Sequence, residues 1–357
     1  MNKQLLINLS VLMRYPTGIS TYILNILPYL QCLSPTLLVS EKINNYNCYN
    51  ISSGLTPEQG VKGHLRRLFW TQLNLPIIYK KLNSKLIFSP LPEAPLFTKC
   101  RSIVMVHDLI PLRFPEGLAA LTYYCKYYMP LVLKNAEHII CNSQATARDI
   151  VDFFAIPAEK ITPIPLACDR DNFRCLNLPT SNYFLYVGRQ NPYKNLSRLI
   201  SAFAQLPKNL DCELWLVGPE DRRYTPILWQ QIEELNLIEK IKILDYVSYN
   251  ELPVLMNQAL ALVFPSLWEG FGLPVLEAMS CGTPVIVANV ASLPEVTGDA
   301  ALLVNPENVE EITAAMAMVV KDGKVRSHLR EKSLTRSLLF NWAVTGEQTA
   351  AILEKFI

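Results

Sequence analysis

The sequence predicts an α/β protein built from two doubly wound domains, each with a parallel sheet covered by helices. Three observations lead to this class: the length of 357 residues, two series of short apolar segments between longer amphipathic stretches, and a polar segment between the two series. A domain usually takes roughly 100–200 residues, so the length suits two. Apolar strands without alternating polar residues are typical of parallel sheets buried on both faces.

The first series of strands lies in the N-terminal half. A helix over 144–155 separates its last two members. The strand candidates are 4–10, 85–90, 101–108, 138–143 and 161–167. These elements assign residues 1–170 to an N-terminal Rossmann-like domain.

The second series predicts a C-terminal Rossmann-like domain over 183–339. Its strand candidates and helices alternate along the chain. The strands are 183–188, 212–218, 240–247, 259–266 and 283–289, and the helices are 195–205, 224–235 and 309–321. Residues 171–182 are polar and lack a periodic apolar pattern, so we predict that they form the linker.

Composition excludes several classes of protein. Half of the residues are hydrophobic and 18% are charged, which is too apolar for a disordered chain. Charged residues or prolines interrupt every apolar run before the roughly 18 residues that a membrane-spanning helix needs. The nine cysteines are odd in number and form no C-x-x-C pair, which suits a reducing cytoplasm.

The charge of the chain is unevenly distributed. Residues 1–178 contain 18 Lys and Arg against 11 Asp and Glu, whereas the remainder contains 15 against 20. The two halves therefore have net charges of +7 and −5. This asymmetry indicates either an anionic partner for the first half or an ordinary imbalance between two domains.

The segment VGRQNPYKN (187–195) places two cations in one turn between a strand and a helix. Gly188 ends the strand, and Arg189 and Lys194 flank a turn that contains Pro192. Cations at the carboxyl end of a strand, next to a helix N-terminus, form a site for a phosphate group. The alternative is a solvated loop with two surface charges.

The segment FPSLWEGFGLPVLEAMSCGTPVIVAN (264–289) contains two carboxylates and two glycines around the start of a helix. Gly270 and Gly272 follow Glu269, and Glu277 lies within the helix. Glycines before a helix let a ligand approach the backbone N–H groups, and an ionised carboxylate can accept hydrogen bonds from two sugar hydroxyls. Each glutamate alone would more often be a carboxylate in the first turn of a helix or a surface charge, and it is their combination that indicates a site.

Together these segments resemble the retaining glycosyltransferases of family four, the group 1 family. This family includes bacterial mannosyl- and glucosyltransferases of polysaccharide biosynthesis. The similarity is strongest in GRQNPYKN, DYVSYNEL, the 264–289 segment and SLPEVTGDAALLVNP, and it continues in the first half through PTGISTYILNIL, VHDLIPLRFPE, CNSQATARDI and IPLACDRDNF. The resemblance implies a GT-B fold, in which two Rossmann-like domains face an interdomain cleft, and a C-terminal helix over 340–357 that crosses back to the first domain.

The resemblance also implies roles for the catalytic residues. Arg189 and Lys194 would contact the diphosphate of a nucleoside-diphosphate sugar. Glu269 would contact the transferred sugar, and Glu277 would bind the ribose hydroxyls. His107 would hydrogen-bond the donor sugar from the acceptor side.

Further contacts to the donor are implied for backbone groups. Gly18 would let the backbone of the N-terminal domain approach the donor phosphates. The family usually has a second glycine at the position of Thr17. The peptide groups of Tyr246 and Val247 would contact the base of the nucleotide. The sugar and phosphate would contact the peptide groups of Gly270, Phe271, Gly272 and Leu273.

The pattern D-x-D at Asp169 and Asp171 is the metal-binding motif of the other large glycosyltransferase fold, GT-A. In that fold it follows a strand inside one nucleotide-binding domain, whereas here it lies at the predicted linker. We therefore expect no metal and no cofactor, with the nucleotide sugar as a substrate.

Residues 61–88 are basic and contain no acidic residue. Phe69 and Trp70 lie beside the cations, a composition typical of a surface attracted to anionic lipid. Pro76 is expected to divide the segment into two helices, and its apolar residues could instead be core. No nucleic-acid module accompanies the cations, which are Lys62, Arg66, Arg67, Lys80, Lys81 and Lys85.

These observations predict a metal-independent, retaining hexosyltransferase of mannose or glucose type. Its acceptor would be a lipid-linked or cell-surface saccharide. We expect it in the cytoplasm, with peripheral association at the inner face of the plasma membrane left open. The alternatives are a GT-B sugar-nucleotide epimerase and a catalytically silent sugar-nucleotide-binding subunit, although the latter would be expected to lose some of Arg189, Lys194 or Glu269.

Overall fold

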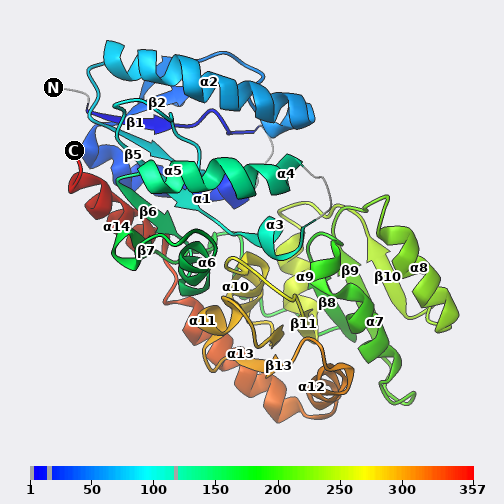
Figure 1. Cartoon of the computed structure of the whole chain (residues 1–357). Coiled ribbons are helices and arrows are strands. Elements are labelled where there is room, and N and C mark those ends of the chain that lie inside the picture. Colours follow the sequence, from blue (N-terminus) through cyan, green and yellow to red (C-terminus); the bar gives the residue numbers. More distant parts are fainter. Residues whose placement is uncertain (1–3, 14–17, 116–119) are drawn as a thin grey trace. The chain divides into compact units, whose positions relative to one another are not determined.

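The computed structural model describes residues 4–13, 18–115 and 120–357 (Figure 1). The chain forms two compact units. Unit 1 comprises Met1–Leu166 together with Trp342–Ile357, and unit 2 comprises Ala167–Asn341. Each unit contains one parallel sheet with helices packed against it, so the predicted class of two doubly wound α/β domains is confirmed.

Unit 1 is built on a parallel sheet of seven strands in the order β3-β2-β1-β4-β5-β6-β7. Aliphatic runs form its central strands, which are buried along their whole length. The strands are β1 (Leu5–Asn8), β2 (Thr36–Val39), β3 (Asn47–Asn50), β4 (Leu86–Ser89), β5 (Ser102–Val106), β6 (His138–Cys141) and β7 (Ile161–Pro163). Strands β2 and β3 were not predicted; β3 is a polar edge strand, whereas β2 is apolar, buried and as long as the predicted β1.

Helices cover both faces of this sheet (Figure 1). The side chain of Ser143 caps α6, where it accepts a hydrogen bond from the N–H of Thr146, so this helix begins where the sequence predicts. The α-helices are α1 (Gly18–Leu30), α2 (Gly60–Lys81), α3 (Ile110–Arg113), α4 (Ala120–Tyr123), α5 (Met129–Asn135), α6 (Gln144–Phe154) and α14 (Trp342–Glu354), with the π-helical turn η3 (Tyr124–Tyr128) and the 3₁₀ turns η1 (Gln31–Leu33), η2 (Pro57–Gln59) and η4 (Ala158–Lys160).

Helix α2 differs from the prediction in two respects. It runs unbroken through Pro76, so the expected division into two helices is wrong. A proline inside a helix costs about 3 kcal/mol, but Leu75 and Ile78 are buried in the core on either side of it, and each such side chain stabilises by about 1.5–3 kcal/mol. Trp70 and Arg67, predicted to lie at a lipid-facing surface, are also buried.

Helix α14 belongs to unit 1 although it ends the chain. It packs on α1 so closely that a Cβ at Gly346 would come within 2.5 Å of the Tyr29 ring. The Thr345 hydroxyl donates a 2.8 Å hydrogen bond to the carbonyl of Pro165. The C-terminal helix therefore completes one face of unit 1.

Unit 2 is built on a parallel sheet of six strands in the order β10-β9-β8-β11-β12-β13. The strands are β8 (Tyr183–Val187), β9 (Glu213–Val217), β10 (Ile241–Leu244), β11 (Ala261–Phe264), β12 (Val285–Ala288) and β13 (Ala301–Val304), of which only β13 was not predicted. The helices are α7 (Leu196–Ala204), α8 (Thr225–Glu234), α9 (Leu252–Gln258), α10 (Leu273–Ser280), α11 (Leu293–Thr297), α12 (Val309–Lys321) and α13 (Gly323–Ser337), with the 3₁₀ turn η5 (Pro192–Lys194).

The segment predicted as a linker, 171–182, belongs to unit 2. Phe173 is buried and meets the Tyr249 ring edge-on at 5.3 Å between centroids. The backbone N–H of Leu176 donates to the Asn257 side chain, and that of Ser181 donates to the Gln258 carbonyl. The packing of this segment was not predictable from its polar composition, because a single buried aromatic ring and backbone hydrogen bonds hold it in place.

The sheet of unit 1 is called sheet A and that of unit 2 sheet B. Both have a point where the strand order reverses, between β1 and β4 in sheet A and between β8 and β11 in sheet B. Open parallel sheets bind ligands beyond the carboxyl ends of the strands at such a point. Predicted site residues lie at both of these edges: His107 follows β5, and Glu269 follows β11.

Candidate active site

Two glycines shape the carboxyl edge of sheet B. Gly188 follows β8 and Gly218 follows β9, with φ angles of 151° and 148°. A Cβ at Gly218 would lie 2.0 Å from the carbonyl oxygen of Gly188, so the two strand ends touch through their backbones. The Tyr186 hydroxyl donates a 2.6 Å hydrogen bond to the carbonyl of Arg189. This leaves the Arg189 side chain exposed at the edge.

Lys194 and Glu269 form an ion pair, with Nζ and Oε1 2.6 Å apart. Both side chains are largely buried, and the ammonium also lies 5.1 Å from the centroid of Tyr193 and 5.3 Å from that of Phe264. The sequence assigned these residues separate roles; the structure brings them together across the ends of β8 and β11. The arrangement presents a preorganised positive and negative charge, and Lys194 lies in the same strand-to-helix turn as exposed Arg189.

The loop that joins Glu269 to α10 is held by Ser292, a fully buried residue that the sequence analysis did not identify. Its Oγ lies 2.9 Å from the carbonyl of Glu269 and 3.0 Å from that of Phe271. Gly272 ends the loop at a φ of 101°, where a Cβ would meet the Leu293 side chain at 2.7 Å. Ser292 thus fixes the backbone that precedes the N-terminus of α10 at Leu273.

Asn195 is a second supporting residue that the sequence analysis missed. It adopts a left-handed conformation with a φ of 65°. Its side-chain Nδ2 donates to the carbonyl of Pro265 at 3.0 Å and to that of Pro306 at 2.6 Å. The turn with Lys194 is therefore tied directly to the segment after β11, which leads to Glu269. An Asn directly after the turn was the available sequence signal.

Glu277 lies on α10, half-buried, near Asp169. Burial, and secondarily the negative charge of Asp169, raise the pKa of the Glu277 carboxyl to about 7. Asp169 accepts hydrogen bonds from the Tyr249 hydroxyl and from the backbone N–H groups of Asp171 and Asn172, so it caps a turn. Within the described part of the chain, no three His, Cys, Asp or Glu side chains are grouped to hold a metal ion.

The remaining predicted residues of unit 2 surround this edge. Tyr246 is exposed and Val247 is half-buried in the loop after β10. Phe271 is buried and its ring meets Phe340 edge-on at 5.9 Å. Gly270 is buried in the loop that Ser292 holds. Only the backbone groups of these residues were predicted to contact a ligand, and those of 270–273 lie at the start of α10.

His107 lies at the carboxyl edge of sheet A, directly after β5. Its Nε2 is 3.0 Å from the carbonyl of Pro90, and since a carbonyl only accepts, Nε2 carries the proton. The ring meets Tyr22 edge-on at 5.4 Å between centroids. Burial lowers the pKa of His107 to about 4, so the ring is neutral near pH 7.

Gly18 is the first residue of α1 and is exposed. A Cβ there would meet nothing within 4 Å, so the chain's own packing does not require this glycine. Thr17, the departure from the family pattern, lies outside the described residues.

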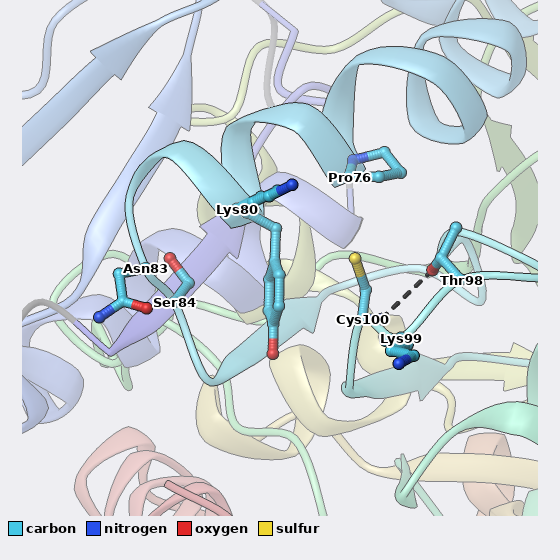
Figure 2. A pocket seen from close by; sticks show the side chains of 8 residues that line it. Pro76, Lys80, Asn83, Ser84, Thr98, Lys99 and Cys100 are labelled. Atoms are coloured by element: carbon cyan, nitrogen blue, oxygen red, sulfur yellow. Dashed lines mark hydrogen bonds between the residues drawn. The ribbon is translucent and has the colours of Figure 1, made fainter.

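A separate hollow of about 330 Å³ opens in unit 1 between the C-terminal end of α2 and the segment before β5 (Figure 2). Lys80, Lys99 and Cys100 line it, together with Ser84, whose buried Oγ has no hydrogen-bond partner. It lies at the amino ends of β4 and β5, the edge of sheet A opposite to His107. The hollow is therefore not part of the site at the carboxyl edge.

The fold and the charged groups at the strand ends define the class of protein, a two-domain GT-B glycosyltransferase. The family models agree: Glycosyltransferase Family 4 matches residues 17–172, and Glycosyl transferases group 1 matches residues 169–336. The chain belongs to the group 1 glycosyltransferase family, and it is a glycosyltransferase enzyme.

Two curated relatives match over most of their length. O-antigen chain mannosyltransferase B of Escherichia coli is 33% identical over 262 residues, which is 70% of this chain and 69% of the relative. O-antigen chain mannosyltransferase RfbU of Salmonella typhimurium is 31% identical over 256 residues, covering 71% of this chain and 70% of the relative.

Two solved structures share the fold. Sucrose-phosphate synthase from Thermosynechococcus elongatus superposes with a TM-score of 0.77 at 20% identity, covering 99% of this chain and 98% of that one. HepE of Anabaena, in complex with UDP and glucose, gives a TM-score of 0.75 at 19% identity, covering 99% of this chain and 100% of that one.

Among the described residues of this protein, no helix is both long and apolar enough to span a bilayer.

Proposed function

We propose that this glycosyltransferase transfers a hexose of mannose or glucose type from a nucleoside-diphosphate sugar to a lipid-linked or cell-surface saccharide, with retention of anomeric configuration. The single observation that carries the proposal is the buried ion pair of Lys194 and Glu269, in which Lys194 belongs to the same turn as exposed Arg189. The relatives named as O-antigen mannosyltransferases support the sugar and the acceptor class.

In this proposal the protein stabilises the leaving diphosphate with its own cations. Arg189 and Lys194 offset the negative charge that develops on the diphosphate as the glycosidic bond breaks, so no metal is required. Glu269 accepts a hydrogen bond from the transferred sugar. The backbone N–H groups at the start of α10, which Ser292 and Gly272 hold in place, add to the positive potential.

Retention is favoured because His107, the candidate general base at the carboxyl edge of sheet A, is poorly suited to that role. Inversion requires a base that takes the acceptor proton, with a pKa near the working pH. His107 was the best candidate, but its Nε2 proton is engaged by Pro90 and its pKa is about 4. We therefore propose that the acceptor attacks from the face that the diphosphate leaves, and that a diphosphate oxygen takes the acceptor proton.

We also propose that unit 1 works at an anionic membrane surface, where a lipid-linked acceptor would be found. The basic segment 61–88 supports this proposal through its exposed cations on α2, such as Lys62, Arg66 and Lys80.

Donor binding tests the proposal. A panel of UDP-, GDP- and ADP-hexoses is screened by thermal unfolding in EDTA, where the true donor at about 100 times its Kd should stabilise the protein by about 2.7 kcal/mol. Affinity should rise about tenfold or more from pH 5.5 to 8, because Glu277, with a pKa of about 7, accepts from ribose hydroxyls through both oxygens only when ionised.

The matched variant is Glu277→Gln, which should bind more weakly and lose the pH dependence. His107 does not titrate in this range, so His107→Ala should keep the wild-type pH profile. Binding that requires Mg²⁺, or an unchanged pH profile in Glu277→Gln, would refute the assignment of these residues.

A further inference from the structure

Helix α2 exposes a continuous row of apolar side chains. Val61, Leu65, Phe69, Leu73 and Ile77 stand at every fourth position, and each is between 49% and 66% exposed. The opposite side of the helix has the buried residues, so this row is additional to the core-facing one. Large apolar side chains scattered singly on a surface are ordinary, but a contiguous row marks an interaction surface.

A second exposed row runs along α4, η3 and α5. Tyr123, Tyr127 and Leu131 stand at every fourth position and are between 44% and 56% exposed. The rings of Tyr123 and Tyr127 stack with centroids 5.9 Å apart. Tyrosine combines an apolar ring with a polar hydroxyl and is favoured at the boundary between water and lipid.

The two rows belong to neighbouring helices of unit 1. The Gln72 side chain on α2 donates a 2.9 Å hydrogen bond to the hydroxyl of Tyr128 in η3. The Gln72 Nε2 and the Tyr128 hydroxyl also both lie 3.0 Å from the carbonyl of Ala94, so α2 and η3 meet at this point. We refer to the two exposed rows together as the apolar face.

The two segments that carry the apolar face contain several exposed cations and no acidic residue. The sequence contains no Asp or Glu from 59 to 92 or from 117 to 136. Lys126 lies over the Tyr127 ring at 5.4 Å, and Figure 2 shows Lys80 extending along α2 toward Pro76. The exposed cations of the two segments are Lys62, Arg66, Lys80, Lys81, Lys126 and Lys134.

A buried ion pair fixes α2 to the segment that contacts His107. Arg67 on α2 binds both carboxylate oxygens of Glu93 at 2.7 Å. Glu93 follows β4 in the same short segment as Pro90, whose carbonyl accepts from His107. A partner that docks on the apolar face therefore meets a surface rigidly joined to the carboxyl edge of sheet A.

We propose that the apolar face is a docking surface for the anionic lipid bilayer, in which α4–α5 takes part together with α2. The apolar rows enter the acyl boundary, and the cations meet lipid phosphates. A second copy of the chain is the less suitable occupant, because two such faces would bring like charges together. This inference rests on the proposed function and extends the membrane contact to residues outside 61–88.

The test is co-sedimentation of the full chain with vesicles of phosphatidylglycerol and phosphatidylcholine, or of phosphatidylcholine alone. One variant combines Phe69→Gln, Leu73→Gln and Ile77→Gln; a second combines Tyr123→Gln, Tyr127→Gln and Leu131→Gln. Each should lower the partition coefficient at least tenfold. The matched control, Ile227→Gln with Ile238→Gln and Leu339→Gln, removes three equally exposed apolar residues from unit 2 and should bind as wild type.

Wild-type binding should require phosphatidylglycerol and weaken as salt rises. Normal binding by the tyrosine variant would overturn the two-helix surface, and binding to phosphatidylcholine alone would overturn the role of the cations. A wild-type dimer that ignores vesicles but dissociates in both variants would identify a second copy as the occupant instead. Donor binding, measured without lipid, should be unchanged in all variants, so a failure here is distinct from a failure of the proposed function.

Discussion

Lys194→Met is expected to lower kcat by about 10² or more, because it removes one preorganised charge from the leaving diphosphate. It should also destabilise the fold, since it leaves the Glu269 carboxylate largely buried without its ammonium partner. Breaking a buried ion pair on one side costs about 3–5 kcal/mol. Lys208→Met, which removes an exposed lysine of the same unit, is the control and should change neither quantity.

The double variant Lys194→Met with Glu269→Gln separates the two effects. Because no unpaired charge remains, its free energy of unfolding, measured in urea, should recover most of the loss. Its kcat should stay as low as that of the single variant or fall further. Recovery of activity together with stability would mean that the pair serves the fold and not the reaction.

Gly218→Ala is expected to lower the free energy of unfolding of unit 2 by about 3 kcal/mol or more, which is near the upper end of the effects of single substitutions. The added Cβ would lie 2.0 Å from the carbonyl oxygen of Gly188, which is backbone and cannot move aside without displacing the end of β8. The φ of 148° adds strain that alanine tolerates poorly. Because Arg189 follows Gly188, donor affinity should fall as well.

Gly323→Ala is the matched control for this substitution. Gly323 begins α13, and its added Cβ would meet only the Arg326 side chain at 3.6 Å. It should change the free energy of unfolding by less than about 1 kcal/mol. A Gly218→Ala protein as stable as this control would contradict the close backbone contact between the ends of β8 and β9.

Local sequence patterns were sufficient to predict the central strands of both sheets. Runs such as Ser102–Val106 and Ala261–Phe264 are apolar without alternation because both faces are covered. Among the strands that were not predicted, Asn47–Asn50 has no apolar signal, whereas Thr36–Val39 and Ala301–Val304 are apolar and as long as the predicted Leu5–Asn8. Pro76 was misjudged because the cost of a proline is local, whereas the burial of Leu75 and Ile78 that offsets it is set by distant residues.

For the candidate site, too, the residues could be predicted from local segments but their contacts could not. Arg189, Lys194, Glu269 and Glu277 could be predicted as candidate site residues because they lie in recognisable segments, and their roles stay predictions. Their pairing could not, since the turn at Lys194 and the loop at Glu269 meet only when β8 and β11 become neighbours in the sheet. Ser292 escaped notice for the same reason: its hydroxyl acts on carbonyls more than twenty residues away in the chain.

The measurement that tests the account most directly is the anomeric configuration of the first-formed product. The protein is incubated with its α-linked nucleoside-diphosphate hexose and a saccharide acceptor, and the new linkage is followed by NMR before any secondary reaction. An α-glycoside is predicted, because the lowered pKa of about 4 makes His107 too weak a base for an inverting displacement and its Nε2–H is held by the Pro90 carbonyl. A β-glycoside would contradict the proposed mechanism and the roles assigned to His107, Arg189, Lys194 and Glu269.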